Sequence, residues 1–142
     1  YSRFKTDKNF SSGIFFFFYT IWMEESVKRK IANEVFVYAN ENKIRGMITV
    51  SEDLGIGKIG LIGVDILSRG KQIGSKLIDF TKNYFNKRGL NKMEVVTQLA
   101  NQNACAFYKH VGFSIAKSEN IYHLWFWICS NFLIFLFYFV KK

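Results

Sequence analysis

The chain has no proline and only two cysteines among its 142 residues. The lack of proline excludes collagen-like sequences, proline-rich linkers and PxxP ligands. Cys105 and Cys129 cannot build a disulfide framework, and neither lies in a Cys/His spacing typical of metal sites. We therefore expect no metal site and a reducing compartment, the cytoplasm. Hydrophobic residues make up 49% of the chain, which excludes a disordered protein and allows a core of domain size.

Negative charge is scarce, because 20 Lys and Arg residues face 11 Asp and Glu residues, for a net charge of +9. Such an excess suggests an anionic partner: nucleic acid, a membrane surface or a polyphosphate cofactor. A nucleic-acid-binding module would alternate basic and aromatic residues on one exposed face. Here the basic residues are spread over expected turns and helix backs, and the aromatic residues gather in apolar runs. We therefore expect no nucleic-acid partner.

Hydrophobic patterning predicts alternating helices and strands. A helix is expected over residues 14–30, although its run of four Phe residues at 15–18 also fits an extra strand. Polar turns then separate three antiparallel strands at 34–39, 44–50 and 58–64. Further along come a helix that ends near Gly89, a strand at 92–97, a helix at 103–111, and extended stretches at 113–117 and 121–126. This order predicts an α/β (α+β) fold: a mixed, mostly antiparallel sheet with a parallel strand pair and flanking helices.

The segment 69–74 lies between a buried strand and the N-terminus of the best-defined helix. Backbone N–H groups point in one direction at such a place, and the helix dipole adds positive potential. Gly70 and Gly74 let the main chain approach a bulky anion, and Arg69, Lys71 and Lys76 add charge. A pyrophosphate is a natural ligand for this loop. An ordinary strand-to-helix turn with solvated basic residues is the alternative.

Two motifs resemble those of the GNAT N-acetyltransferases. The loop resembles motif A, R/Q-x-x-G-x-G/A, in which Arg69 and Gly74 match the ends and Gln72 replaces the middle Gly. Downstream, a strand is followed by N-x-x-A-x-x-x-Y-x-x-x-G-F. Its positions are filled in order by Asn101, Ala104, Tyr108, Gly112 and Phe113.

The resemblance implies a GNAT fold and acetyl-CoA as cosubstrate, from which an acetyl group passes directly to a primary amine. Strands 59–64 and 92–97 are expected to splay apart. The pantetheine arm of acetyl-CoA then lies in the gap and bonds to the main chain of residues 62–64. Tyr108 is the implied catalytic residue, which protonates the departing thiolate. The implied cofactor-binding residues are Ile62, Gly63, Val64, Arg69, Gly70, Lys71, Gln72, Ile73, Gly74, Ser75, Asn101, Ala104 and Phe107.

The general base is left open among Asp65, His123 and a chain of water molecules. Asn101 is also expected to cap the helix that follows it. Cys105 has no His/Asp arrangement around it in the sequence, so we do not expect it to be a nucleophile. A small buried helix residue is its expected role.

A narrower resemblance concerns the acceptor. Segments 1–4, 19–22, 64–65, 96–98 and 121–125 resemble the TDP-fucosamine acetyltransferase type of nucleotide-sugar N-acyltransferase. This implies a small-molecule amine acceptor, possible homodimerisation and a missing N-terminal portion. A degenerate, non-catalytic GNAT-like domain that binds CoA weakly or not at all is the rival interpretation, because the N-terminal portion is missing and Gln72 alters the expected phosphate-binding loop at 69–74.

The C-terminus is unusually apolar. Residues 124–140 carry no charge and are followed by Lys141 and Lys142. At about 1.5 Å per residue a helix of this length spans only about 26 Å, near the short limit for a membrane. Three interpretations stay open: a membrane-attached tail, a strand and helix packed on the domain, or a tail foreign to the fold. We favour a GNAT domain over 1–126 and an apolar extension over 127–142, without membrane contact.

Overall fold

The computed structural model describes residues 6–11, 13–124 and 136–139. The chain divides into two compact units, Tyr1–Val111 and Gly112–Lys142. The boundary that we expected at 126–127 lies outside the described residues. Within the described part, no helix is both long and apolar enough to cross a membrane.

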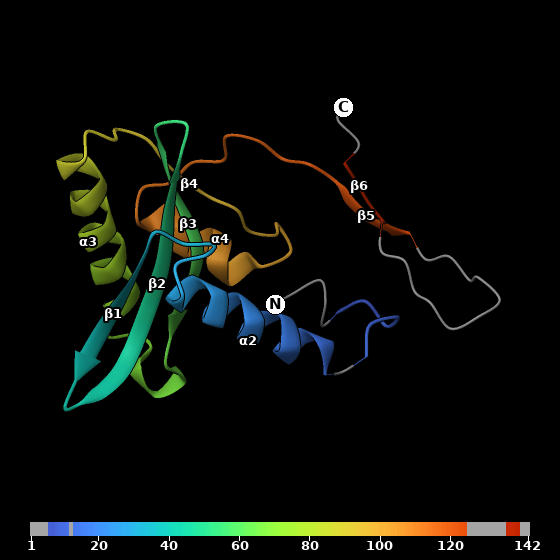
Figure 1. Ribbon diagram of the computed structural model, residues 1–142, viewed down its shortest axis with the longest axis horizontal. Helices are drawn as coiled ribbons and strands as arrows, with labels where there is room; N and C mark the ends of the chain where they lie inside the picture. Colours follow the sequence, from blue (N-terminus) through green and yellow to red (C-terminus); the bar gives the residue numbers. More distant parts are fainter. Residues whose placement is uncertain (1–5, 12, 125–135, 140–142) are drawn as a thin grey trace. The chain divides into compact units, whose positions relative to one another are not determined.

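A four-stranded sheet forms the centre of the first unit. Its strands are β1 (Glu34–Asn40), β2 (Lys43–Asp53), β3 (Ile56–Val64) and β4 (Met93–Val95), which lie side by side in that order (Figure 1). The first three are antiparallel neighbours, whereas β3 and β4 run parallel. Both predicted hairpins and the predicted fold class are therefore confirmed. β4 is shorter than the strand expected at 92–97.

Helix α3 (Ile73–Lys87) connects β3 to β4 and packs on one face of the sheet. Its predicted apolar stripe is confirmed, because Leu77, Ile78, Thr81 and Phe85 are buried and Tyr84 is half-buried. Two glycine residues of the sheet lie where α3 comes close to it. A Cβ atom at Gly57 would lie 2.5 Å from the Phe85 ring, and one at Gly46 would lie 2.7 Å from Ile73. Close packing thus explains these two glycines.

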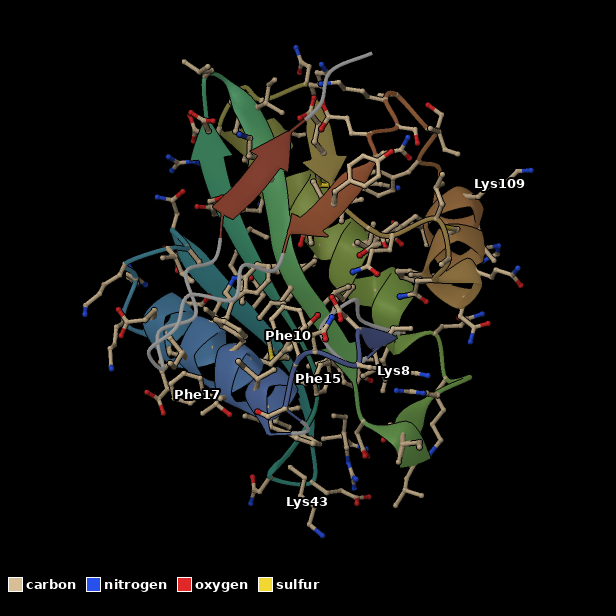
Figure 2. The ribbon with its side chains drawn as sticks, turned by 90° about the vertical axis from the view of Figure 1, so that its right-hand side faces the viewer. Lys8, Phe10, Phe15, Phe17, Lys43 and Lys109 are labelled. Atoms are coloured by element: carbon tan, nitrogen blue, oxygen red, sulfur yellow. The ribbon has the colours of Figure 1, made fainter. Side chains whose placement is uncertain are left out.

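Helix α2 (Ile14–Val27) covers the other side of the sheet (Figure 1). The indole nitrogen of Trp22 lies 3.9 Å from the position of a Cβ at Gly60 in β3. The Phe run is helical, so the alternative of an extra strand is wrong. The helix ends three residues before the predicted position, at a turn in which Arg29 has a φ of 59°. Phe17, labelled in Figure 2, is 61% exposed.

The second unit departs from the predicted pattern. Strands β5 (Ile121–Leu124) and β6 (Leu136–Phe139) pair with each other in a two-stranded antiparallel sheet, not with the four-stranded sheet. The stretch 113–117 was predicted to be extended but forms no strand. Phe113 is half-buried, but Ile115 is 75% exposed, so the stretch does not present the buried face that a strand of the sheet would have. Residues 125–126 of the last predicted strand lie outside the described residues.

Candidate functional site

The pairing of β3 with β4 is short. Only three residues of β3, from Gly57 to Ile59, have a parallel partner in β4. Beyond them β3 runs on to Val64, whereas the chain leaves β4 after Val95. Among the described residues, no strand pairs with this side of β3 from residue 60 to residue 64. Within the part of the chain that the structure describes, β3 therefore has an open edge at residues 60–64, the place where we predicted splayed strands.

The open part of β3 is also accessible at its side-chain positions. Gly63 is exposed, and a Cβ built on it would meet no atom within 4 Å. Ile62 and Val64 are half-buried. An extended chain could thus approach the main chain of these residues and bond to it as a neighbouring strand would.

The end of β3 leads into the predicted anion loop. A short 3-10 turn, η1 (Ile66–Ser68), follows the strand, and Arg69 donates from Nε to the Val64 carbonyl at 3.4 Å. Gly70 and Gln72 then adopt left-handed conformations, with φ of 76° and 60°. Arg69, Gly70, Lys71 and Gln72 are all exposed. Lys76, which we expected to add charge to this loop, lies over the Tyr38 ring at 5.4 Å.

Helix α3 begins without a side-chain cap. Gln72 makes no capping hydrogen bond, the first turn contains no acidic residue, and the first intrahelical bond runs from Lys76 N–H to the Gln72 carbonyl at 3.0 Å. The amides of Ile73, Gly74 and Ser75 therefore have no acceptor within the helix. Uncapped N–H groups and the positive end of the helix dipole together favour an anion at this point.

Helix α4 (Gln102–His110) lies against the start of α3. The Phe107 ring approaches to 3.1 Å from the position that a Cβ on Gly74 would take. Asn101 caps α4 as predicted, because its Oδ1 accepts from the Ala104 amide at 3.3 Å. A glycine at 74 thus lets Phe107 pack on the loop. The structure brings Phe107 and the predicted anion loop together at Gly74, which the motif alone did not require.

Tyr108, the predicted catalytic residue, lies in α4 and is 9% exposed. Its ring is 5.4 Å from that of Phe107, measured between centroids. Burial raises the pKa of Tyr108 to about 12, because the phenolate would lose its hydration. Tyr108 therefore keeps its proton at neutral pH and is a hydrogen-bond donor.

Asp65, one candidate base, is part of a polar cluster directly after β3. Its carboxylate accepts from Ser68 Oγ at 2.9 Å and from Arg45 at 3.4 Å. The Ser68 bond is the main reason why the pKa of Asp65 lies below its ordinary value. A carboxylate with a lowered pKa is a weaker base than an ordinary Asp. Arg45 and Ser68 could not be chosen from the sequence, because neither belongs to a motif.

The other residues weighed in the sequence are His123 and Cys105. His123 lies in β5, opposite Phe137, and its side chain is outside the described part. Cys105 is half-buried in α4 and its Sγ lies 3.6 Å from the Gln98 carbonyl oxygen. The described residues contain no group of three or more His, Cys, Asp or Glu that could hold a metal ion. Figure 2 shows Lys8, Lys43 and Lys109 at three separate places on the molecule.

The family model of the acetyltransferase (GNAT) family matches residues 8–113. The chain belongs to this family. No curated protein sequence matches it significantly. Most of the GNAT match falls in the first unit, which holds the open strand edge and the uncapped helix.

Solved structures resemble this GNAT chain. One is a protein assigned as a streptothricin acetyltransferase of Bacillus anthracis str. Ames in complex with acetyl coenzyme A, with 27% identity over 58% of this chain and a TM-score of 0.57. Another is an IAA acetyltransferase of Bacillus cereus ATCC 14579, with 26% identity over 58% of this chain and a TM-score of 0.56. The matches cover 48% and 56% of those chains, so this chain spans about half of their length.

The fold also matches that of an aminoglycoside N-acetyltransferase, AAC(6′)-Iy, in complex with CoA. The TM-score is 0.62 at 14% identity, over 74% of this chain and 88% of that one. At this identity the match supports the GNAT fold and says nothing of the acceptor. A shared fold does not determine a substrate, because specificity depends on the residues of the site.

Proposed function

We propose that this GNAT protein is an acetyl-CoA-dependent N-acetyltransferase that acts on a primary amine of a small molecule. One observation carries the proposal: an uncapped helix N-terminus and an open strand edge follow one another along the chain, from Gly60 to Ser75. The helix end can bind a pyrophosphate. The strand edge can bind an extended chain of amide groups, such as pantetheine.

The phosphate loop would hold the pyrophosphate by its main chain. The amides of Ile73, Gly74 and Ser75 lack an acceptor within α3, and Gly70, Lys71 and Gln72 form the exposed loop before them. The Arg69 guanidinium supplies positive charge at the same end of β3. Asn101, Ala104 and Phe107 belong to the start and middle of α4, and Phe107 packs on Gly74. We propose that these residues line the cofactor on the opposite side.

The chemistry requires three tasks of the protein. The amine nitrogen attacks the thioester carbonyl, a C–N bond forms, and the C–S bond then breaks. A main-chain N–H near Val64 would stabilise the oxyanion of the tetrahedral intermediate. A base must take one proton from the amine, and the departing thiolate must be stabilised and protonated.

We assign the stabilisation of the departing thiolate to Tyr108. A thiol has a pKa of about 8.5, so full transfer from a phenol of pKa about 12 is uphill by about 3.5 pKa units, or ~5 kcal/mol. This difference favours a strong hydrogen bond from the Tyr108 hydroxyl to the departing sulfur while the C–S bond breaks, after which the released thiolate takes its proton from water. The raised pKa ensures that the proton is present throughout the neutral range.

The Tyr108→Phe variant tests this role. We expect kcat to fall by about a hundred- to a thousandfold, the range of one lost transition-state hydrogen-bond donor, with the KM for acetyl-CoA nearly unchanged. Tyr84→Phe is the matched control, because Tyr84 lies in α3 and its ring packs on Phe36 at 5.0 Å. Equal kcat values for the two variants would remove Tyr108 from the reaction.

The acceptor class is proposed separately from the cosubstrate. The narrower resemblance favours a nucleotide-linked amino sugar, whereas one solved relative is named for the antibiotic nourseothricin. We therefore propose a thiol-release assay with acetyl-CoA and a panel of primary amines that contains nucleotide-linked amino sugars, streptothricin-type antibiotics and an N-terminal peptide amine. Release above the amine-free rate with one class identifies the acceptor.

The rival function is a GNAT domain that has lost catalysis. One observation favours it, namely that Gln72 carries a Cβ in the left-handed position where the motif has glycine. A thermal midpoint that does not rise with millimolar acetyl-CoA would support this rival and contradict the proposed function.

A further inference from the structure

Thr49 occupies an unusual place between β2 and β3. It is 1% exposed, and its Oγ1 accepts a hydrogen bond from the Leu61 amide at 2.8 Å. A Cβ on Gly60 would lie only 2.8 Å from the same oxygen, so β3 bends closely around this hydroxyl. The Thr49 hydroxyl therefore accepts the hydrogen bond of the Leu61 N–H, which a main-chain carbonyl would accept in a regular ladder.

The strand contains one extra residue at this point. Ile48 is paired with Ile62 and Val50 with Ile59, so that Gly60 and Leu61 both stand opposite Thr49. Two residues against one is the definition of a β-bulge, a feature that redirects a strand. Thr49 satisfies the amide that the bulge removes from the ladder.

The bulge changes which amides face the open edge. The Gly57 amide points toward β4, where it bonds the Lys92 carbonyl at 2.9 Å. In a regular strand every second N–H points the same way, so the Leu61 amide would also face that edge. Instead it points toward β2, as does the Asp65 amide, which bonds the Arg45 carbonyl at 2.9 Å.

The amides between them follow by alternation. Since the Leu61 and Asp65 N–H groups point toward β2, the N–H groups of Ile62 and Val64 point to the opposite, open edge. The Val64 carbonyl on that edge already accepts from Arg69 Nε at 3.4 Å. Without the bulge, the amides of Leu61 and Gly63 would occupy this edge instead.

We propose that Thr49 is a positioning residue for acetyl-CoA. Its hydroxyl fixes the bulge, and the bulge presents the Ile62 and Val64 amides to the pantetheine arm and the thioester. The inference rests on the proposed function, because it assigns these two amides to that ligand. Loss of the hydroxyl leaves the part-buried Leu61 amide without its acceptor, and restoring the ladder requires a slip of one residue.

The test separates the two ends of the cosubstrate. Acetyl-CoA reaches both the phosphate loop and the strand edge, whereas adenosine 3′,5′-bisphosphate carries no pantetheine and probes only the nucleotide end. In Thr49→Val we expect acetyl-CoA to bind about tenfold more weakly, the effect of about one lost hydrogen bond, with unchanged binding of the nucleotide. Calorimetry measures both affinities, and the KM for acetyl-CoA should rise more than kcat falls.

Two further variants make the result specific. Thr49→Ser keeps the hydroxyl and should restore the affinity for acetyl-CoA. Thr81→Val is the matched control, because Thr81 is equally buried and its Oγ1 donates to the Leu77 carbonyl at 2.8 Å within α3. This variant removes a buried hydroxyl of the same domain and should not selectively weaken the binding of acetyl-CoA.

The outcomes are distinguishable. If wild-type protein binds neither molecule, the proposed function fails and the inference fails with it. Suppose that wild-type protein binds acetyl-CoA, and that Thr49→Val keeps its affinity for both ligands or loses affinity for both equally. The proposed function then stands and the role of Thr49 is overturned. A selective loss of acetyl-CoA that Thr49→Ser reverses supports the role.

Discussion

Replacing Gln72 by glycine should stabilise the protein, contrary to the usual effect of adding a glycine. Gln72 has a φ of 60° and a ψ of 13°, a left-handed conformation that costs a residue with a Cβ about 1–2 kcal/mol. Glycine avoids this cost but adds about 0.4–1 kcal/mol of unfolded-state freedom. The difference leaves a net stabilisation of about 0.5–1 kcal/mol.

Gln72→Ala is the matched control, since alanine also carries a Cβ and keeps the left-handed strain. For a chain of 142 residues, ~1 kcal/mol moves the thermal midpoint by roughly 2–4 °C. We therefore expect the glycine variant to melt roughly 1–4 °C above the alanine variant, as followed by circular dichroism. A glycine variant that melts below the alanine variant would refute the left-handed geometry at this position.

The same pair of variants tests whether the loop 69–74 binds the pyrophosphate of acetyl-CoA. If the main chain at Gln72 approaches the pyrophosphate, removal of the Cβ should increase the rise in midpoint that acetyl-CoA produces. The alanine variant should resemble wild type in this respect. An equal rise in both variants would place the ligand away from residue 72, even if the strain is real.

Two other predictions concern the neighbours of this loop. The carboxylate of Asp65 has a lowered pKa chiefly through Ser68, so its stabilising contribution is complete above the ordinary Asp value of about 3.9 and is lost as the pH falls through the lowered pKa. Urea midpoints should therefore fall less steeply with acid in Asp65→Asn than in wild type, and parallel slopes would contradict this. Gly74→Ala should lower both the thermal midpoint and the affinity for acetyl-CoA, because its Cβ would lie 3.1 Å from the Phe107 ring. Phe107→Leu in the same background should recover part of both, and no recovery would show that the ring is not the obstacle.

Local patterns predicted most of the elements of the first unit. The stripe of α3 repeats with the helical period, so Leu77, Ile78 and Phe85 could be assigned to one buried face before any partner was known. The Asn101 cap depends on an amide only three residues away. Such features need only neighbours in the sequence, and the structure confirms them.

The extended stretch at 113–117 shows where this reasoning fails. Its residues have strand-like composition, yet a strand exists only where a second strand accepts and donates its ladder bonds. The same dependence separates β5 from the four-stranded sheet, because its partner is β6. A pattern can propose an extended segment but does not name its partner.

The sequence by itself determined the family and the residues of its two motifs, since these depend on residue types at fixed spacing. Only the tertiary structure decided three features of the site: the bulge around Thr49, the left-handed Gln72 and the contact of Phe107 with Gly74. The bulge depends on the contact of Leu61 with Thr49, and the third feature is the contact of Phe107 with Gly74. Each of these contacts joins residues at least 12 positions apart. The physical reason is that periodicity encodes which face of an element is buried, whereas register and backbone direction are set by the surface against which the element packs.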